Sequence, residues 1–309
     1  MKIIIGTRGS KLALWQAYFV QEKIQTAGHE AEIKVIETKG DKILDVAISK
    51  IGSKGVFTEE IEEQLANGSI DIAVHSAKDL QSSLDDGFEI IAFSEREKMN
   101  DVVVSHLENF DFGNKEKEWV IGTSSTRRIA TLKHFHPHIK TVDIRGNLQT
   151  RIRKMEEGLC DGILLAYAGV HRMEYDEMIK YELPLDEFTP AVGQGSIAIE
   201  VHESLEESKK EIVRFAINHN HSETCLKAER AYLRYLDGGC SIPVFGLAKL
   251  NGINNLQLEA GIISLDGQER ISLKMSDTPE NAEKLGTIMA KTILAKGGDK
   301  ILKEIKAQL

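Results

Sequence analysis

The sequence predicts an α/β protein of two similar lobes with a hinge, followed by a small C-terminal α+β domain with a three-stranded antiparallel sheet. Segments typical of strands alternate with segments typical of helices as far as residue 200, which is the pattern of α/β units. One motif occurs twice: Ile5–Lys11 and Trp119–Arg128 both lead from an apolar segment through a small polar turn to a basic helix start. After Ser222 the pattern changes to one helix, three alternating segments and a helical end.

The first lobe is expected to cover residues 1–95 together with 196–215. Its strands are expected at Ile3–Ile5, Ile33–Ile36, Ile70–Val74, Phe88–Phe93 and Ile197–Val201. Apolar residues at helical spacing predict two helices, one with Leu12, Trp15, Phe19, Val20 and Ile24 on one face and one with Phe57, Ile61 and Leu65. After Pro190, two glycines flank Gln194, and this arrangement indicates a hinge.

The second lobe is expected at residues 100–190 and the C-terminal domain at residues 220–309. Strands of the second lobe are expected at Val102–Val104, Trp119–Gly122, Thr141–Ile144 and Gly162–Ala166, with a helix that carries Leu148, Ile152 and Met155. The three alternating segments of the C-terminal domain lie near Val244–Lys249, Leu256–Ile263 and Arg270–Lys274. Such a unit combines a small antiparallel sheet with helices.

Length and composition indicate an ordinary globular protein. The 309 residues are 41% hydrophobic, and no run reaches the roughly 20 apolar residues that span a membrane. The start, Met-Lys with three isoleucines, does not resemble a secretory leader, so we expect a cytoplasmic protein. The net charge of −9 argues against a nucleic-acid surface, which usually shows as a broad basic face. Three cysteines leave an odd count without a C-x-x-C motif, so reduced thiols are expected.

Basic residues follow the predicted strands at similar positions. They are Arg8, Lys78, Arg127, Arg128, Arg145 and Arg172. Ser124 and Ser125 precede the arginine pair at a helix start, where hydroxyls, backbone N–H groups and guanidinium groups all attract anions. Arg151 lies about one turn into a helix that Asn147 is expected to cap. Because open α/β sheets bind ligands at the carboxyl ends of their strands, we expect these residues to converge on one cleft for a polyanion.

Several of these signals also have simpler explanations. The Lys78-Asp79 pair is most simply an exposed ion pair of little energetic value. The loop with Lys50 and Lys54 lacks the order of a nucleotide P-loop and is either a solvated loop or a flexible basic lid. His134, His136 and His138 lack a carboxylate or cysteine partner in sequence, so they are interpreted as surface polar groups and no metal site is expected.

Cys240 is the cysteine best placed for chemistry. It lies in a Gly-Gly-Cys turn before Ile242, where its sulfur could meet a ligand, and nearby cations would favour the thiolate. Cys160 and Cys225 are expected to be small buried apolar residues.

These segments, in this order, closely resemble the hydroxymethylbilane synthase family, also called the porphobilinogen deaminase family. The matching motifs cover nearly the whole chain and form a highly specific set. They are Thr7–Ser10 with Leu12–Ala17, Lys54-Gly55, His75–Asp79, Gly122–Ser125 with Arg127-Arg128, Arg145–Asn147, Pro190–Gly195 and Gly238–Cys240. Three positions depart from the usual pattern, namely Lys11, Gln81 and Thr126, and they concern loop conformation rather than the reaction.

The resemblance implies a transferase of tetrapyrrole and heme biosynthesis. Such an enzyme joins four porphobilinogen molecules head to tail, releases ammonia each time, and frees linear hydroxymethylbilane by hydrolysis. It also implies a dipyrromethane cofactor attached to Cys240 by a thioether, a monomeric state, and transfer of the product to uroporphyrinogen-III synthase. Each pyrrole carries an acetate and a propionate, so the growing chain is a polycarboxylate and requires an arginine-rich cleft.

The resemblance also assigns roles to individual residues. Asp79 would be the catalytic group, as a buried carboxylate that stabilises the cationic azafulvenium left by loss of ammonia and assists proton transfers. The residues implied in cofactor binding are Cys240, Lys78, Asp79, Ser124, Ser125, Arg127, Arg128 and Arg145. Those implied in substrate binding are Arg8, Ser10, Arg145, Arg151, Arg172 and Gln194. Lys50 and Lys54 match an active-site loop that would cover the cleft.

Two other functions fit parts of the sequence. A non-catalytic two-lobed anion-binding module is one alternative, because periplasmic-binding-protein-like lobes joined by a hinge also form solute receptors and the ligand domains of transcription regulators. The third domain with its cysteine argues against that alternative. A phosphate-transferring enzyme is the other, and the sequence has neither a P-loop nor an obvious metal-binding carboxylate cluster for it.

Overall fold

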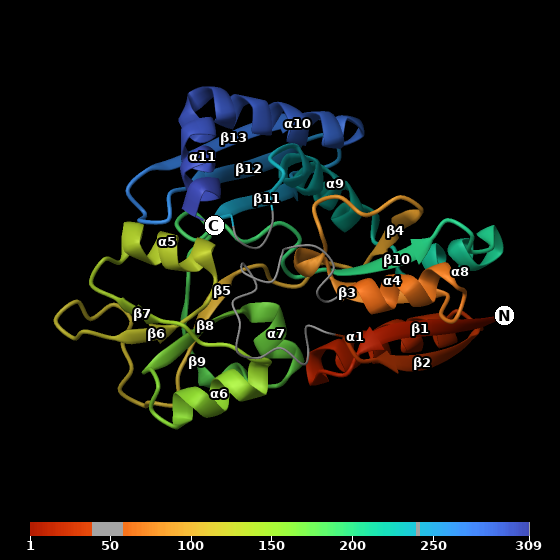
Figure 1. Ribbon diagram of the computed structural model, residues 1–309, viewed down its shortest axis with the longest axis horizontal. Helices are drawn as coiled ribbons and strands as arrows, with labels where there is room; N and C mark the ends of the chain where they lie inside the picture. The colour runs from red at the N-terminus through yellow and green to blue at the C-terminus, as the bar shows by residue number, and fades with distance from the viewer. Residues whose placement is uncertain (39–57, 239–241, 309) are drawn as a thin grey trace. The chain divides into compact units, whose positions relative to one another are not determined.

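The computed structural model describes residues 1–38, 58–238 and 242–308 (Figure 1). The chain divides into two compact units, Met1–Glu97 with Gly195–Thr224, and Lys98–Gln194 with Cys225–Leu309. The second lobe and the C-terminal region thus belong to one unit. The finer division into three domains stays a prediction.

The first unit is built on a five-stranded sheet of order β2-β1-β3-β10-β4. Its strands are β1 (Lys2–Arg8), β2 (Glu30–Ile36), β3 (Ile72–Ser76), β4 (Phe88–Phe93) and β10 (Ile197–His202). Strands β1, β2 and β3 are parallel, whereas β10 is antiparallel to both β3 and β4. The helices among its described residues include α1 (Lys11–Thr26), α4 (Glu59–Ala66), the short η1 (Ala77–Asp79) and α8 (Glu207–Ile217).

Both faces of this sheet are covered by helices. On one face, Ile3, Ile5 and Ile72 pack in a cluster with the apolar residues of α1 and α8. On the other face, Ala73 packs with Ile61 and Leu65 of α4. Apolar residues on both faces of a strand are typical of a parallel sheet sandwiched between helices, and they explain why these strands are continuous apolar runs in the sequence.

The second lobe repeats this plan with a sheet of order β7-β6-β8-β5-β9. Its strands are β5 (Asp101–Val104), β6 (Val120–Gly122), β7 (Lys140–Val142), β8 (Gly162–Ala166) and β9 (Ile179–Glu182). Its helices are α5 (Thr126–Phe135), α6 (Leu148–Glu156), α7 (Tyr167–Arg172) and the short η2 (Asp176–Met178). Strands β6, β7 and β8 are parallel, and β5 is antiparallel to β8 and β9.

The similarity of the two lobes extends to single atoms. In the first lobe the backbone N–H of Ile4 donates to the carboxylate of Asp71 at 2.7 Å, and in the second the N–H of Val120 donates to Asp161 at 2.8 Å. A Cβ at Gly6 would lie 2.3 Å from Ile70 Cδ1, and a Cβ at Gly122 would lie 2.9 Å from Cys160 Sγ. In both lobes a Cβ at this glycine would press on the side chain of a residue that lies just before the next parallel strand, which supports the repeat expected from sequence.

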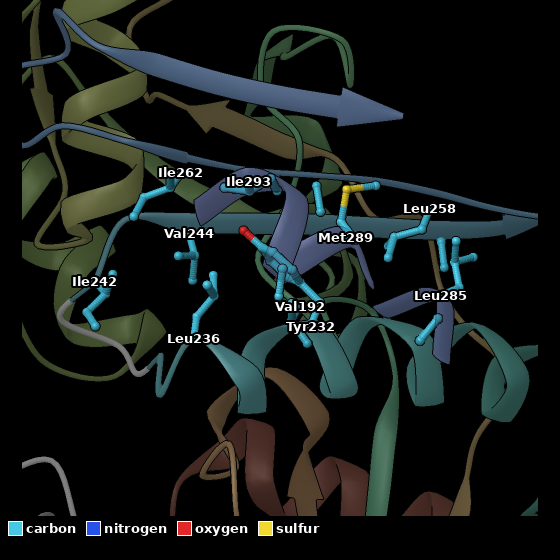
Figure 2. Close-up of a cluster of buried hydrophobic side chains, with 14 of the residues drawn as sticks. Val192, Tyr232, Leu236, Ile242, Val244, Leu258, Ile262, Leu285, Met289 and Ile293 are labelled. Atoms are coloured by element: carbon cyan, nitrogen blue, oxygen red, sulfur yellow. The ribbon is translucent and has the colours of Figure 1, made fainter. Parts of the chain in front are cut away.

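The C-terminal region contains a three-stranded antiparallel sheet of order β11-β12-β13. Its elements are α9 (Asn220–Tyr235), β11 (Val244–Leu250), β12 (Leu256–Ile263), β13 (Arg270–Asp277), η3 (Pro279–Asn281), α10 (Ala282–Ile293), η4 (Leu294–Gly298) and α11 (Asp299–Gln308). Figure 2 shows its core, where Tyr232 of α9 lies among the apolar residues of β11, β12 and α10. The Tyr232 hydroxyl donates to the carbonyl of Gly261 at 2.7 Å, so this buried polar group is satisfied.

The expected strands are found, with differences at some ends and one omission. β3 begins at Ile72 rather than Ile70, because the N–H of Ile70 donates to the carbonyl of Gln64 and closes the turn after α4. β7 ends at Val142 rather than Ile144, whose carbonyl instead accepts a hydrogen bond from Ser124. Strand β9 was not expected, because this edge strand of sequence IKYE has only four residues, too few for a clear pattern, and none of them is buried. Phe57 lies outside the described residues.

Candidate functional site

In the first unit, the predicted basic positions follow neighbouring parallel strands. Arg8 ends β1, and Lys78 follows the end of β3 in the short helix η1. Because β1 and β3 are paired in parallel, both residues lie at the same edge of the sheet. Ser10 is the N-cap of α1, where its hydroxyl accepts the backbone N–H of Ala13 at 3.3 Å. This bond leaves the Ser10 O–H as a donor.

The turn that carries Asp79 is anchored on both sides. The backbone N–H of Ala77 donates to the carbonyl of Ser196 at 2.9 Å, and the amide of Gln16 donates to the hydroxyl of Ser76 at 2.8 Å. Asp79 itself is exposed, so the expectation of a buried carboxylate is wrong.

A buried pair of ionisable residues lies directly before this turn, and sequence reasoning missed it. His75 Nε2 lies 2.9 Å from a carboxylate oxygen of Glu200, and their side chains are 8% and 0% exposed. Glu62 lies in the same surroundings: burial raises its pKa, a hydrogen bond with Thr58 lowers it, and the charge of Glu200 raises it. Glu200 was missed because a single acidic residue in an otherwise apolar strand does not show which residue it will contact.

In the second unit, three adjacent parallel strands lead to the arginines. β6 leads into α5 with Arg127 and Arg128, β7 leads to Arg145, and β8 leads into α7, which ends at Arg172. The strand order β7-β6-β8 therefore places all four arginines after the same edge of the sheet. Within this unit the four arginines share one edge of the sheet, and their convergence on one cleft stays a prediction.

Arg127 and Arg128 differ from the other basic residues because both are buried. Their guanidinium groups converge on the carboxylate of Asp101, which is 0% exposed. The sequence predicted that this pair binds the anionic group of a ligand. In the structure, both arginines bind the carboxylate of Asp101 instead. Burial alone would raise the pKa of Asp101, but the charges and hydrogen bonds of the two arginines hold it well below its usual range. Asp101 was missed because it is 26 residues from Arg127 in the sequence.

The strand-end turns of this lobe are built by side-chain hydrogen bonds. Ser124 donates to the carbonyl of Ile144 at 2.6 Å, and Ser125 is the N-cap of α5. Asn147 caps α6 as expected, through the N–H of Thr150 at 2.9 Å. Both serines therefore bond to the backbone, and both residues are partly exposed.

The partly exposed arginines also have protein partners. Arg145 donates from Nε to Asp143 at 3.0 Å, and Arg151 donates from Nε to the carbonyl of Gly146 at 2.7 Å. Gly146 has a φ of +113°, a backbone conformation that favours glycine. Burial alone would raise the pKa of Asp143, but hydrogen bonds with Ser124 and Arg145 bring it below its ordinary value.

The expected hinge segment is held by two buried carboxylates. Gln194 donates from Nε2 to the carbonyl of Met99 at 2.7 Å and to Asp101 at 3.0 Å. The neighbouring N–H of Gly193 donates to Glu229 at 2.9 Å. Gly193 and Gly195 have φ values of +80° and +97°, so both glycines are needed for this turn. Hinge motion stays a prediction.

The remaining predicted residues divide into those that the structure describes and those that it does not. Lys50, Lys54 and Cys240 lie outside the described residues. Cys160 and Cys225 are buried, as expected. His136 has a partner that the sequence did not indicate, because Glu187 lies 3.1 Å from its Nε2.

Among the described residues there is no cluster of three or more His, Cys, Asp or Glu that could hold a metal ion, and no helix is long and apolar enough to cross a membrane.

Comparison with known proteins gives full-length matches. The family model described as "Porphobilinogen deaminase, dipyromethane cofactor binding domain" matches residues 3–210, and "Porphobilinogen deaminase, C-terminal domain" matches residues 223–295. The porphobilinogen deaminase of Desulfosudis oleivorans is 53% identical over 308 residues, which cover 100% of this chain and 99% of that protein. That of Cytophaga hutchinsonii is 56% identical over 305 residues, which cover 99% and 97%.

Among solved structures, a likeness is found to the periplasmic VFT2 domain of Bordetella pertussis BvgS. The TM-score is 0.43 at 14% identity, and the match covers 70% of this chain and 86% of that chain. This likeness is too distant to support an argument about function.

Proposed function

The chain belongs to the porphobilinogen deaminase family, and on that premise we propose how its residues divide the work of the reaction. The protein is a transferase of tetrapyrrole biosynthesis. It condenses four porphobilinogen molecules head to tail with release of ammonia, and hydrolysis then gives linear hydroxymethylbilane. The observation that carries this conclusion is identity above one half over the full length of two relatives.

The residues at the edge of the second-lobe sheet fit a dipyrromethane group. Such a group carries acetate and propionate side chains, which require cations and hydroxyl donors. Arg127, Arg128, Arg145, Ser124 and Ser125 follow two adjacent parallel strands there. When bound, the group supplies the pyrrole end to which the first substrate is joined. Arginine suits this task because its planar fork of N–H groups binds a carboxylate through two hydrogen bonds.

Further residues are assigned to the cofactor by the resemblance alone. Cys240 holds it through a thioether bond, because a thiolate is the strong sulfur nucleophile that such a bond requires. Lys78 and Asp79 bind it as well. Lys78 contributes a compact positive charge suited to a carboxylate.

Six residues are assigned to the binding of incoming substrate and growing chain, five of them directly to its carboxylates. They are Arg8, Ser10, Arg145, Arg151, Arg172 and Gln194. The partial exposure of Arg8, Arg145 and Arg172 supports this assignment, because their side chains are in reach of a ligand in solution. Gln194 is buried against Asp101, so its contribution is to hold the turn that borders the site.

Asp79 is assigned to the chemical step. Loss of ammonia leaves positive charge on the reacting group, and a carboxylate placed beside that charge stabilises it and can carry a proton. Asp79 is exposed, so bound substrate must remove water from it for the charge interaction to reach full strength. Its anchored turn supports the role, because a fixed carboxylate loses little freedom on binding.

The remaining assignments come from the family. The protein acts as a monomer in the cytoplasm and passes hydroxymethylbilane to uroporphyrinogen-III synthase. Lys50 and Lys54 belong to the loop that covers the bound substrate. The monomeric state, the location, the transfer of product and the role of the loop do not depend on the residue roles above, so each is tested separately.

The intact mass of freshly purified protein under denaturing conditions tests the cofactor and its attachment point. We expect a stable excess equal to two linked pyrrole units, absent in Cys240→Ser and present in the matched control Cys160→Ser. An unmodified mass that gains nothing from porphobilinogen or preformed hydroxymethylbilane, with no porphyrin colour after acid and light, would contradict the proposed function. An excess that persists in Cys240→Ser would contradict only the attachment point.

A further inference from the structure

Asp101 receives four hydrogen bonds although its side chain has no exposed surface. Oδ2 accepts Nη2 of Arg127 at 2.8 Å, and Oδ1 accepts Nε and Nη2 of Arg128 at 3.1 and 2.6 Å. Oδ1 also accepts Nε2 of Gln194 at 3.0 Å. Oδ1 thus accepts three hydrogen bonds and Oδ2 one, from donors of α5 and of the turn at Gln194, so both carboxylate oxygens are held.

The two guanidinium groups are further fixed by backbone carbonyls. Arg127 donates from Nη1 to Thr189 at 3.1 Å, and Arg128 donates from Nη1 to Leu164 at 2.9 Å. Among the described residues, the bonds of Arg127 therefore come from its two Nη atoms, whereas a guanidinium group has five N–H donors. The orientation of Arg127 is thus set by protein groups while donors remain for another acceptor.

The charges in this cluster do not cancel. Two buried guanidinium groups face one buried carboxylate, which leaves one positive charge in a place where water is excluded. Burial lowers the pKa of Arg127, Asp101 raises it, and the charge of Arg128 lowers it. Asp101 is therefore the group that allows two like charges to lie together in the interior.

We infer that Asp101 is a positioning residue for cofactor binding, acting through Arg127 and Arg128. The inference rests on the proposed function, in which these arginines bind cofactor carboxylates. Asp101 contacts no ligand in this role. It fixes the direction of both guanidinium groups before a ligand arrives, and displacement of such groups by about 1 Å can cost on the order of 100-fold in an assembled site.

Cofactor acquisition by apoprotein tests this role. Apoprotein is titrated with preformed hydroxymethylbilane, and the gain in intact mass is followed. We expect the half-saturating concentration to rise at least about 10-fold in Asp101→Asn, since the variant leaves two buried charges unneutralised. Asp161→Asn is the matched control. Like Asp101→Asn, it removes the charge of a carboxylate in this lobe, but Asp161 accepts the backbone N–H of Val120 instead of the guanidinium groups of the arginines. Half-saturation within about twofold of wild type in folded Asp101→Asn would overturn the inference.

Asp101→Glu covers the case in which Asp101→Asn does not fold. It keeps the neutralising charge but moves the carboxylate by one methylene. We expect its half-saturation to rise about 5-fold or more, and an unchanged value would again contradict the positioning role.

A second readout does not depend on the cofactor. In the NMR spectrum of uniformly labelled apoprotein, the Nε–H of Arg128 should exchange slowly with water in wild type and quickly in Asp101→Asn. If wild-type apoprotein gained no mass, the proposed function would be contradicted. If the Arg128 Nε–H still exchanged faster in Asp101→Asn than in wild type, the orienting contact between Asp101 and Arg128 would remain supported. Retained protection in Asp101→Asn would contradict the inference itself.

Discussion

Glu229 accepts the backbone N–H of Gly193 at 2.9 Å, and its other carboxylate oxygen accepts the N–H of Ala248 at 2.8 Å. The glutamate is 0% exposed, so the turn next to Gln194 and the strand β11 are both fastened to one buried side chain of α9. The first prediction concerns these two hydrogen bonds of Glu229. Glu229→Ala should lower the free energy of unfolding by about 3 kcal/mol, because two buried N–H groups lose their acceptor and a cavity forms.

Glu229→Gln provides the comparison for this prediction. Glutamine keeps one acceptor oxygen but turns an NH₂ group toward the second N–H, so a loss of about 1.5 kcal/mol is expected. Both values come from urea unfolding, with the exposed Glu269→Ala as the control that should change little. Equal free energies of unfolding for Glu229→Ala and wild type would show that these two hydrogen bonds do not stabilise the protein.

The second prediction concerns Gly195, which follows the same turn. Its φ is +97°, and a Cβ built there would lie 2.5 Å from the carbonyl oxygen of Glu97. Gly195→Ala should therefore destabilise the first unit by about 3 kcal/mol through backbone strain plus the clash. Gly68→Ala separates the two causes, because Gly68 has a φ of +72° with no atom within 4 Å of the added Cβ. It should cost about 1 kcal/mol.

Thermal and urea unfolding of both glycine variants supply these numbers. If Gly195→Ala were no more destabilising than Gly68→Ala, the close approach to Glu97 would be relieved at no cost. That result would indicate a backbone near Gly195 that shifts easily, which is what the hinge prediction requires.

The third prediction is a pH dependence from Cys160. Burial raises the pKa of this thiol from 9.0 to about 11, although hydrogen bonds with backbone N–H groups partly oppose it. A raised folded pKa means that the thiol contributes stability below pH 9, and that this contribution is lost as pH rises toward 11. Over that interval wild type should lose about 2 kcal/mol more than Cys160→Ala.

The measurement for Cys160 is urea unfolding of wild type and Cys160→Ala at pH 8 and at pH 10.5. Other alkaline titrations, such as that of Tyr232, occur in both proteins and cancel in the comparison. Parallel losses in the two proteins would mean that the thiol titrates alike in the folded and unfolded states. In the folded protein at pH 8, Cys160 should also react very slowly with thiol reagents.

The fourth prediction concerns the chemical step. Asp79→Asn should consume porphobilinogen at least about 100-fold more slowly, because an amide neither carries the negative charge nor accepts the proton. Since Asp79 is exposed, the thermal midpoint should be unchanged. Asp86→Asn, a nearby exposed aspartate, should keep normal turnover. Near-normal turnover of Asp79→Asn would remove the catalytic assignment.

The strands and helix caps could be predicted from sequence because their causes are local. The strands β3, β5 and β8 are runs of mostly apolar, almost wholly buried residues, so hydrophobicity alone marks them. Ser10, Ser125 and Asn147 cap helices through bonds to residues three positions further on, which is a pattern visible in any linear reading.

The buried carboxylates could not be predicted, because their partners are distant in sequence. Asp101 is 26 residues from Arg127 and 93 from Gln194, and Glu229 is 36 residues from Gly193. A single acidic residue in an apolar segment gives no sign of what it will meet. The same limit explains the exposure of Asp79, since burial depends on surrounding elements rather than on the residue itself.

The sequence by itself determined the repeated lobes, the three-stranded C-terminal sheet, and the placement of basic residues after successive parallel strands, because each follows from periodicity and short-range turn chemistry. Only the tertiary structure decided that Arg127 and Arg128 share a buried carboxylate while Arg8, Arg145 and Arg172 stay partly exposed. The physical reason is desolvation. A charge removed from water must find an opposite charge, and which residue supplies it is settled only when distant strands are brought side by side.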